Sequence, residues 1–210
     1  IGQQRGDALP FSCRCGSTFV TNYREWAKTI WTDTPMRVMG LGLRAAVLEN
    51  HPFEVSDFGI GIDPGRNFGL AVVSPKGGSL VVYYGYCHLS PDDDYATDGW
   101  TAFRLVEELL ATSPRALDAA VEGAAYSREH RGQIELAYIR QGFFLGLTAS
   151  GHFPKMVAPN SIRLAATGSG KVSMGDLLPT MNGNAADALG AALFASGFRA
   201  EKYDPLAPVR

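Results

Sequence analysis

The chain has 210 residues, of which 46% are hydrophobic and 19% charged, and its formal net charge is −2. This balance excludes a disordered chain and predicts one substantial domain with an extension, because a second full domain would need more residues. The near-neutral charge excludes an overall basic nucleic-acid binder, so any DNA contact must come from a local patch of Arg and Lys.

Membrane and secretion signals are absent from the sequence. There is no run of about 18 apolar residues, and the first residues lack the charged start and apolar stretch of a secretion signal. Three cysteines, Cys13, Cys15 and Cys87, are too few for a disulfide framework. We therefore expect reduced thiols, a cytoplasmic location and no membrane partner.

Residues 1–56 have mixed polarity and are interpreted as an N-terminal extension of unknown role. Helices are expected over 23–30 and 37–49. Cys13 and Cys15 could begin a zinc site with Cys87 and His88 as distant ligands, but no second pair follows at the usual spacing. Unmetallated thiols are therefore the favoured interpretation.

From residue 57 the pattern becomes regular. Three apolar, β-prone runs are separated by DPGRN and KGG, which are turn formers, so they predict an antiparallel meander. Amphipathic helical segments then alternate with two short apolar strands. This order predicts an α/β fold with a mixed sheet flanked by helices. The expected later elements are a helix over 100–113, a buried strand over 117–122, a helix over 132–148, a strand over 155–159, helical segments over 161–166 and 171–178, and an Ala-rich helix over 184–198.

Three acidic residues occupy positions that such an architecture brings to one end of the sheet. Asp63 closes an apolar strand before a Pro-Gly turn, and Glu122 closes the strand at 117–122 in the same manner. Asp187 falls in the first turn of the last helix, three residues after Asn184 on the same face. Clustered carboxylates repel one another and normally mark a divalent-cation site, so these residues predict a Mg²⁺ site. Two such ions about 4 Å apart would support phosphodiester hydrolysis without a covalent intermediate.

Each acid also has a plain structural interpretation. Asp63 suits a common Asp-Pro-Gly turn, and Glu122 suits a surface position after a strand. Asp187 suits an interaction with the helix dipole. Their order, and the elements that carry them, together favour the metal site.

Four blocks follow one another along the chain: GIDPGRNFGLAVV, AVEGAAYS, VAPNSIRLAATGSGKVSM and NAADALGAAL. They resemble, in this order and spacing, the opening strand and turn, the second acidic strand, the basic Gly-x-Gly and Lys segment, and the closing acidic helix of RuvC-type Holliday junction resolvases. The resemblance covers about residues 58–198. It implies a ribonuclease H-like fold over 57–200, with antiparallel first three strands and a C-terminal tail at 201–210.

The resemblance also implies roles for individual residues. Asp63, Glu122 and Asp187 match the family's metal-binding acids, for which Mg²⁺ is the expected cofactor and Mn²⁺ its substitute. Arg163 and Lys171 match basic residues near the scissile phosphate, and Lys171 is expected to act in catalysis with the three acids. Family members act as homodimers that introduce paired nicks into four-way DNA junctions. The expected partners are therefore branched DNA and a second copy of the chain, in a bacterial or phage-encoded setting, with an organelle as the alternative.

Two positions depart from the family. Asn184 stands where the family usually has a fourth acid or a histidine, so it would coordinate Mg²⁺ through a neutral oxygen and weaken the second metal. Ala125 stands where the family carries an aromatic that helps to open the junction. Tyr126 is the nearest residue that could stack on a base.

Two further segments are candidates for DNA contact. The TGSGK segment fails as a Walker A motif, because Val172 stands where Ser or Thr should hold magnesium. Gly168 and Gly170 are interpreted as a flexible lead into a helix near Lys171, where backbone amides and the lysine contact a DNA phosphate. Arg128 is expected to contact a DNA arm. Ordinary solvated positions are the alternative for both segments.

The apolar helix at 132–148 is expected to be buried, either in the core or against a dimer partner. Histidines in expected loops and segment ends are predicted to be solvated, and these are His51, His130 and His152.

Two other functions remain open from the sequence. One is a nuclease of the same fold that acts on flaps, branched DNA or RNA–DNA hybrids, because a fold does not determine its substrate. The other is a catalytically silent DNA-binding protein whose degenerate site is signalled by Asn184.

Overall fold

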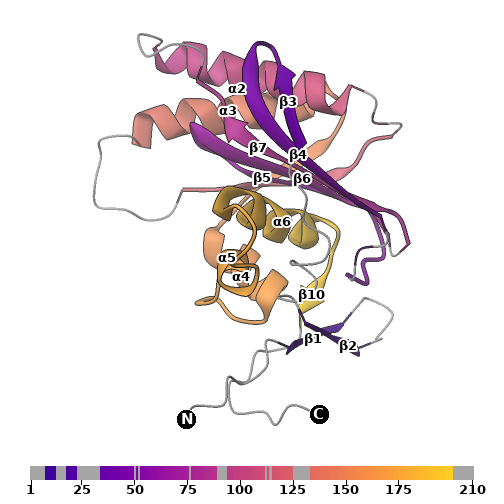
Figure 1. Cartoon of the computed structure of the whole chain (residues 1–210). Helices are drawn as coiled ribbons and strands as arrows, with labels where there is room; N and C mark the ends of the chain where they lie inside the picture. The colour runs from indigo at the N-terminus through magenta and orange to yellow at the C-terminus, as the bar shows by residue number, and fades with distance from the viewer. Residues whose placement is uncertain are drawn as a thin grey trace.

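A seven-stranded mixed sheet with helices on both faces forms the centre of the computed structural model (Figure 1). The structure describes residues 8–12, 18–22, 34–49, 51, 53–75, 77–88, 94–111, 113, 115–124 and 133–200, with only the main chain at 8–12 and 18–22. The predicted α/β fold with a mixed sheet flanked by helices is confirmed. Tyr126, Arg128, His130, Cys13, Cys15, the helix expected over 23–30 and the tail at 201–210 all lie outside the described residues.

The strands are β1 Ala8–Ser12, β2 Thr18–Asn22, β3 Thr34–Val38, β4 Leu41–Glu49, β5 Gly59–Asp63, β6 Asn67–Val73, β7 Ser79–Tyr86, β8 Asp118–Glu122, β9 Phe153–Val157 and β10 Arg199–Ala200. The helices are α2 Tyr95–Leu110, α3 Gln133–Ala149, α4 Pro159–Thr167, α5 Met174–Leu177 and α6 Gly183–Ala195.

The large sheet has the order β3-β4-β7-β6-β5-β8-β9. Strands β5, β6 and β7 pair antiparallel, as the turn formers between them predicted, and β8 runs parallel to both β5 and β9. A separate three-stranded sheet joins β1 and β2 to β10. The later predicted elements are all present, although α5 begins at Met174 and not near Lys171, because Ser173 caps it and forms a capping box with Asp176.

The helix predicted over 37–49 is wrong. These residues form most of a hairpin, β3 and β4, which extends the large sheet at the β7 edge. The two residues between the strands, Met39 and Gly40, have φ values of 53° and 83°, the left-handed conformation of a tight hairpin turn. The sheet therefore begins within the segment that the sequence suggested was an extension.

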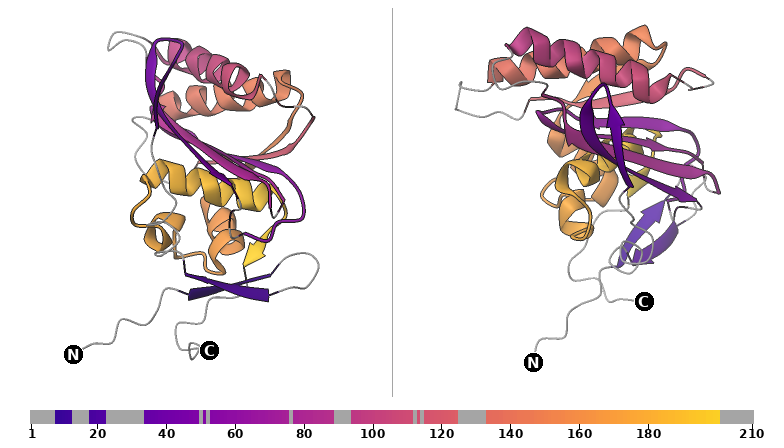
Figure 2. Two further views of the ribbon diagram at one scale, coloured as in Figure 1. Left: turned by 45° about the vertical axis from the view of Figure 1, so that its right-hand side comes forward. Right: turned by 45° about the horizontal axis from the view of Figure 1, so that its top comes forward.

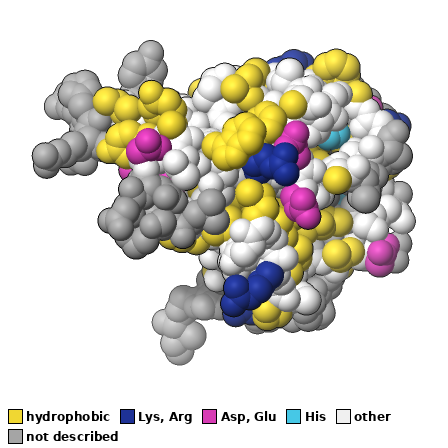
Figure 3. Space-filling view, turned by 90° about the horizontal axis from the view of Figure 1, so that it is seen from above, with side chains coloured by type: hydrophobic (Ala, Val, Ile, Leu, Met, Phe, Trp, Pro, Cys, Tyr) yellow, Lys and Arg dark blue, Asp and Glu magenta, His cyan; other side chains and the backbone are white. Residues whose placement is uncertain are grey.

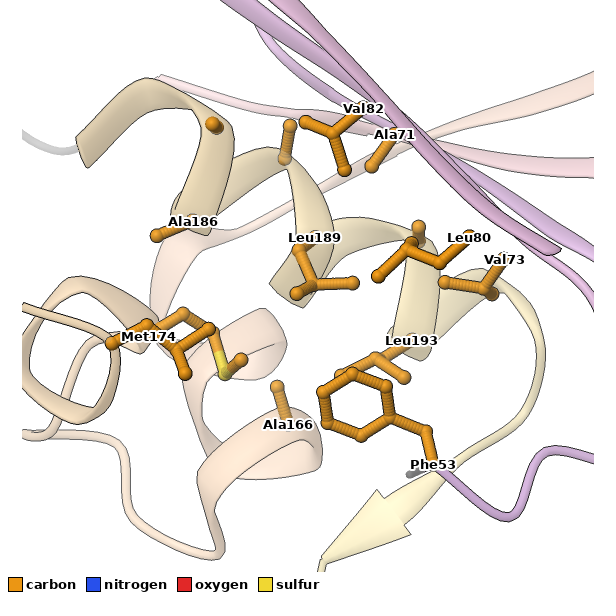
Figure 4. Close-up of a cluster of buried hydrophobic side chains, with 14 of the residues drawn as sticks. Phe53, Ala71, Val73, Leu80, Val82, Ala166, Met174, Ala186, Leu189 and Leu193 are labelled. Carbon is orange, nitrogen blue, oxygen red and sulfur yellow. The ribbon is translucent and has the colours of Figure 1, made fainter. Parts of the chain in front are cut away.

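Helices α2 and α3 cover one face of the sheet, and α6 covers the other with α4 and α5 beyond it (Figures 1 and 2). Ile60 and Ile62 of β5 pack with Leu105 and Phe143 under the first pair. On the opposite face, side chains of β6 and β7 pack against α6, α4 and α5 (Figure 4). Each face of β5 is therefore buried, which explains its nearly continuous apolar sequence.

Helix α6 lies unusually close to the sheet because glycines face it. A Cβ atom at Gly61 would lie 2.1 Å from the carbonyl oxygen of Ala188 and 2.1 Å from the amide nitrogen of Ala192. A Cβ atom at Gly69 would lie 2.0 Å from the carbonyl oxygen of Asn184. The main chain of α6 therefore occupies the space that side chains would need, and this contact fixes where the helix begins over the sheet.

Two histidines expected to be solvated are buried. His51 is 2% exposed, and its Nε2 lies 2.6 Å from the carbonyl oxygen of Ser74. His152 is 3% exposed, and its Nδ1 accepts from the amide of Leu117. Each ring bonds a main-chain group between sheet elements, which the sequence pattern alone does not reveal.

Candidate active site

Asp63 and Glu122 lie side by side at the carboxyl ends of two parallel strands. Ile62 of β5 is level with Val121 of β8, so the next residue on each strand reaches the same edge of the sheet. Side chains alternate along a strand. Asp63 therefore projects on the face of Gly61, which is covered by α6, and Glu122 projects on that same face.

Helix α6 brings Asp187 to this edge. Gly69 is paired with Asp63, and the carbonyl of Asn184 lies directly against Gly69, so the first turn of α6 lies over the end of β5. The Asn182 side chain caps the helix by accepting from the amides of Asn184 and Ala185. Asp187 follows in the second turn and not in the first as predicted, because the helix already begins at Gly183.

The three carboxyl groups interact electrostatically. Burial, and then the charges of Glu122 and Asp187, raise the pKa of Asp63 from its ordinary 3.8 to about 8. Burial and the charge of Asp187 raise the pKa of Glu122. Burial likewise raises the pKa of Asp187. Burial alone can raise the pKa of a carboxyl group, but the contributions of Glu122 and Asp187 to the shift of Asp63, and of Asp187 to that of Glu122, require these charges to lie close together. The tertiary structure therefore brings the three sequence-predicted acids to one place.

Two arginines lie beside the acids. Arg163 of α4 lowers the pKa values of Glu122 and Asp187 and so partly opposes the effect of burial. Arg140 of α3 donates from Nε to the carbonyl oxygen of Glu122 at 3.0 Å, and its charge acts on Asp63 and Glu122. Arg163 was expected here, whereas Arg140 was not. Its only sequence signal is that it is the sole Lys or Arg within α3.

Lys171 does not join this group. It is exposed, and the cations that shift the pKa values of the acids are Arg140 and Arg163. Lys171 instead lines an open hollow of about 710 Å³ together with Gly168, Gly170, Ser169 and Arg199. Gly168 has a φ of 74° and ends α4 as a left-handed cap, so its role in the loop is to stop a helix. The candidate DNA-binding loop therefore lines this separate hollow and is not part of the acidic site.

The predicted metal ligands are Asn184 and the three acids. Half-buried Asn184 lies in the first turn of α6, three residues before Asp187. Within the part of the chain that the structure describes, no three His, Cys, Asp or Glu side chains are arranged to hold a metal ion as they stand. The three acids are thus within electrostatic range of one another without forming a closed set of ligands.

The thiol of Cys87 is engaged elsewhere, which favours the interpretation without zinc. The thiol of Cys87 donates to the carbonyl oxygen of Gly65 at 3.1 Å, and burial raises its pKa to about 12. His88 Nδ1 is bonded to the carboxylate of Asp98. A zinc site would need a thiolate, whereas burial keeps the Cys87 thiol protonated and bonded to a carbonyl oxygen.

The arrangement of the sheet and helices is that of a RuvC-like, ribonuclease H-like fold. No family model matches the chain, and no curated protein sequence matches it. Among solved structures, the chain is similar to RuvC of Thermus thermophilus, with 20% identity and a TM-score of 0.51 over 69% of this chain and 98% of that chain.

A second structure of T. thermophilus RuvC, in complex with a Holliday junction substrate, is 22% identical with a TM-score of 0.52. The similarity covers 67% of this chain and 97% of that one. These likenesses establish the fold. They also indicate that about a third of this chain has no counterpart in those proteins.

None of the helices in the described part of the chain is both long enough and apolar enough to span a membrane.

Proposed function

We propose that this protein is a metal-dependent endonuclease that cuts branched DNA, with four-way junctions as its substrate. The observation that carries the proposal is the convergence of three acids at one edge of a RuvC-like sheet: burial and the charges of Glu122 and Asp187 raise the pKa of Asp63, and burial and the charge of Asp187 raise that of Glu122. A cluster of partly buried acids is costly for the fold unless a cation neutralises it. Such a cost is expected at a functional site.

The chemistry of the donors fits Mg²⁺, with Mn²⁺ as a substitute. Three carboxylates and the amide oxygen of Asn184 are hard oxygen ligands of the kind that Mg²⁺ prefers, and this ion also keeps several waters. Asp63, Glu122 and Asp187 would hold the metal, with Asn184 at its margin. Bound Mg²⁺ would lower the pKa of an attacking water and stabilise charge on the phosphate. The acids must adjust their side chains on binding, because they do not form a closed ligand set as they stand.

Cationic side chains supply the contacts to DNA in this proposal. Arg163 lies within electrostatic range of two acids and would contact the scissile phosphate. Lys171 and the hollow around it would bind the sugar–phosphate backbone farther along an arm. Lys171 is therefore proposed to contribute to binding more than to the chemical step.

A homodimer is proposed because apolar side chains are exposed on the outer face of α2 and α3. Ile139, Phe143 and Leu147 of α3 are buried in the core, so one face of this helix follows the core alternative left open by the sequence. Figure 3 views the molecule from the side of these helices. Large apolar side chains remain exposed there, namely Tyr95, Trp100, Ile134, Leu136, Tyr138 and Leu145. A patch of this kind on a protein of this size normally contacts another protein.

Cleavage of a synthetic four-way junction in the presence of Mg²⁺ tests the proposal. The wild-type chain should introduce paired nicks, whereas Asp63→Asn should bind the junction but cut roughly 1,000-fold more slowly, because metal ions contribute several kcal/mol of transition-state stabilisation. Asp118→Asn is the matched control, since Asp118 is an exposed acid at the opposite end of β8. It should cut like wild type. Magnesium-dependent cleavage that survives in Asp63→Asn would remove the proposal.

Two competing functions are tested in the same way. Because the fold does not determine the substrate, flaps and RNA–DNA hybrids are included as substrates in the same assay, and preferential cutting of either would replace the junction. Asn184 and the open arrangement of the acids favour a silent DNA-binding protein. Failure to bind millimolar Mg²⁺ or Mn²⁺ by calorimetry, with junction binding retained, would establish that alternative.

A further inference from the structure

The turn that follows Asp63 is held from the side of the sheet opposite to α6. Arg66 lies in the turn between β5 and β6, three residues after Asp63, and its Nε donates to Asp98 Oδ2 at 3.2 Å. It also forms an ion pair with Glu135. Asp98 lies in the first turn of α2, and Glu135 in the first turn of α3. One side chain thus connects the turn to the ends of two helices.

Asp98 is the buried centre of this connection. Its side chain is fully buried, whereas that of Arg66 is 34% exposed. The other carboxylate oxygen, Oδ1, accepts from Nδ1 of His88, a residue just beyond β7 that is also buried. A buried carboxylate is tolerated only when its oxygens are bonded in this way. The three side chains therefore fix one another's positions.

The main chain of the turn is held as well. The carbonyl of Arg66 accepts from the amide of Cys87 at 2.7 Å, and the carbonyl of Gly65 accepts from the Cys87 thiol at 3.1 Å. The segment after Asp63 is therefore bonded through its carbonyl groups to Cys87, just beyond β7, and through the Arg66 side chain to α2 and α3.

We propose that Arg66 is a positioning residue for Asp63: by tying the turn to Asp98 and Glu135, it keeps the Asp63 carboxylate level with Glu122 at the edge of the sheet. This inference rests on the proposed nuclease function. Metal ligands must be held within roughly 0.5 Å of a productive geometry by the groups behind them. The acids here must close around an ion, so a turn that moves freely would weaken binding of that ion.

The test compares wild type with Arg66→Gln, which keeps hydrogen-bonding capacity but loses the charge. The amount of Mg²⁺ that gives half-maximal junction cleavage should rise about tenfold, and kcat should fall roughly tenfold or more, as is typical when support behind a metal ligand is lost. The KM for DNA should stay constant, because Arg66 is proposed to act through Asp63. Mn²⁺ binding measured by calorimetry should weaken by the same factor as the Mg²⁺ requirement.

Three further variants separate positioning from simple stabilisation. Arg66→Lys retains the charge and should recover part of the metal affinity. Glu135→Gln leaves the bond to buried Asp98 intact, so it should fold even if Arg66→Gln does not, and it should raise the Mg²⁺ requirement about threefold. Arg104→Gln is the matched control, because it removes an exposed ion pair with Glu107 on α2. It should leave metal binding unchanged.

The outcomes distinguish this inference from the proposed function. If Arg66→Gln and Glu135→Gln melt at lower temperature but keep the wild-type Mg²⁺ requirement and Mn²⁺ affinity, Arg66 is only a structural residue and the inference is overturned. If wild type cuts, Asp63→Asn does not, and both variants cut like wild type, the nuclease stands without the positioning role. If wild type neither binds Mn²⁺ nor cuts any substrate, both proposals fail together.

Discussion

Stability against pH tests whether Asp63 is buried beside the other two acids, independently of any enzymatic activity. Burial and the charges of Glu122 and Asp187 raise the pKa of Asp63 to about 8, whereas in the unfolded chain it has its ordinary value of 3.8. Between these two values the folded protein binds a proton that the unfolded chain has released. Raising the pH through this window in EDTA must therefore destabilise the fold.

The magnitude follows from the width of that window. Inside it, each pH unit changes the folding equilibrium constant about tenfold through Asp63, so the step from pH 5 to pH 7 lowers the free energy of unfolding by roughly 3 kcal/mol. In Asp63→Asn this contribution is absent. Burial lowers the pKa values of His51 and His152, which gives an opposite pH dependence, but both histidines are present in the two proteins and cancel in the comparison.

Urea unfolding at pH 5, 6, 7 and 8, in EDTA, measures the effect. The wild-type free energy of unfolding should fall relative to that of Asp63→Asn at each step, and millimolar Mg²⁺ at pH 8 should stabilise wild type more than the variant. Parallel pH profiles for the two proteins would show that Asp63 titrates at its ordinary pKa. The convergence of the acids, and the nuclease proposal with it, would then be refuted.

Two other predictions concern packing and assembly. Gly61→Ala should destabilise the fold by roughly 3 kcal/mol in urea unfolding, because its Cβ atom would overlap the main chain of α6. The control Gly42→Ala, with no atom within 4 Å of the added Cβ, should change stability by less than about 0.5 kcal/mol. Equal urea midpoints for the two variants would contradict the close contact of α6 with the sheet. Ile134→Glu should convert the dimer to a monomer in sedimentation experiments, because Ile134 is 63% exposed on the apolar face of α3, while Val47→Glu on β4, at 57% exposed, should not. A wild-type chain that stays monomeric at high concentration would refute the dimer.

The elements from β5 to α6 could be predicted because their signals are local. The apolar run GIGID, the turn formers after it and the apolar period of α2 each act within a few residues. The same local logic placed Asp63 and Glu122 at strand ends. The hairpin at 34–49 also carried a local signal. Gly40 lies in the turn, and Leu41 and Leu43 are separated by one small residue, as in a strand with one buried face. The apolar run after Leu43, however, suits a helix equally well.

The grouping of charges was decided only by the tertiary structure. Arg140 reaches the acids because α3 passes behind β8, and Lys171 stays apart because α4 ends at Gly168 and turns the loop toward the β10 side. Arg66 meets Asp98 across 32 positions of sequence. The sequence alone determined which acidic residues end the strands, because strand ends depend on neighbouring residues along the chain. Which cations lie beside those acids, and which side chains hold them in place, depends on how the helices pack across the sheet. Packing brings together residues whose proximity no local sequence pattern indicates.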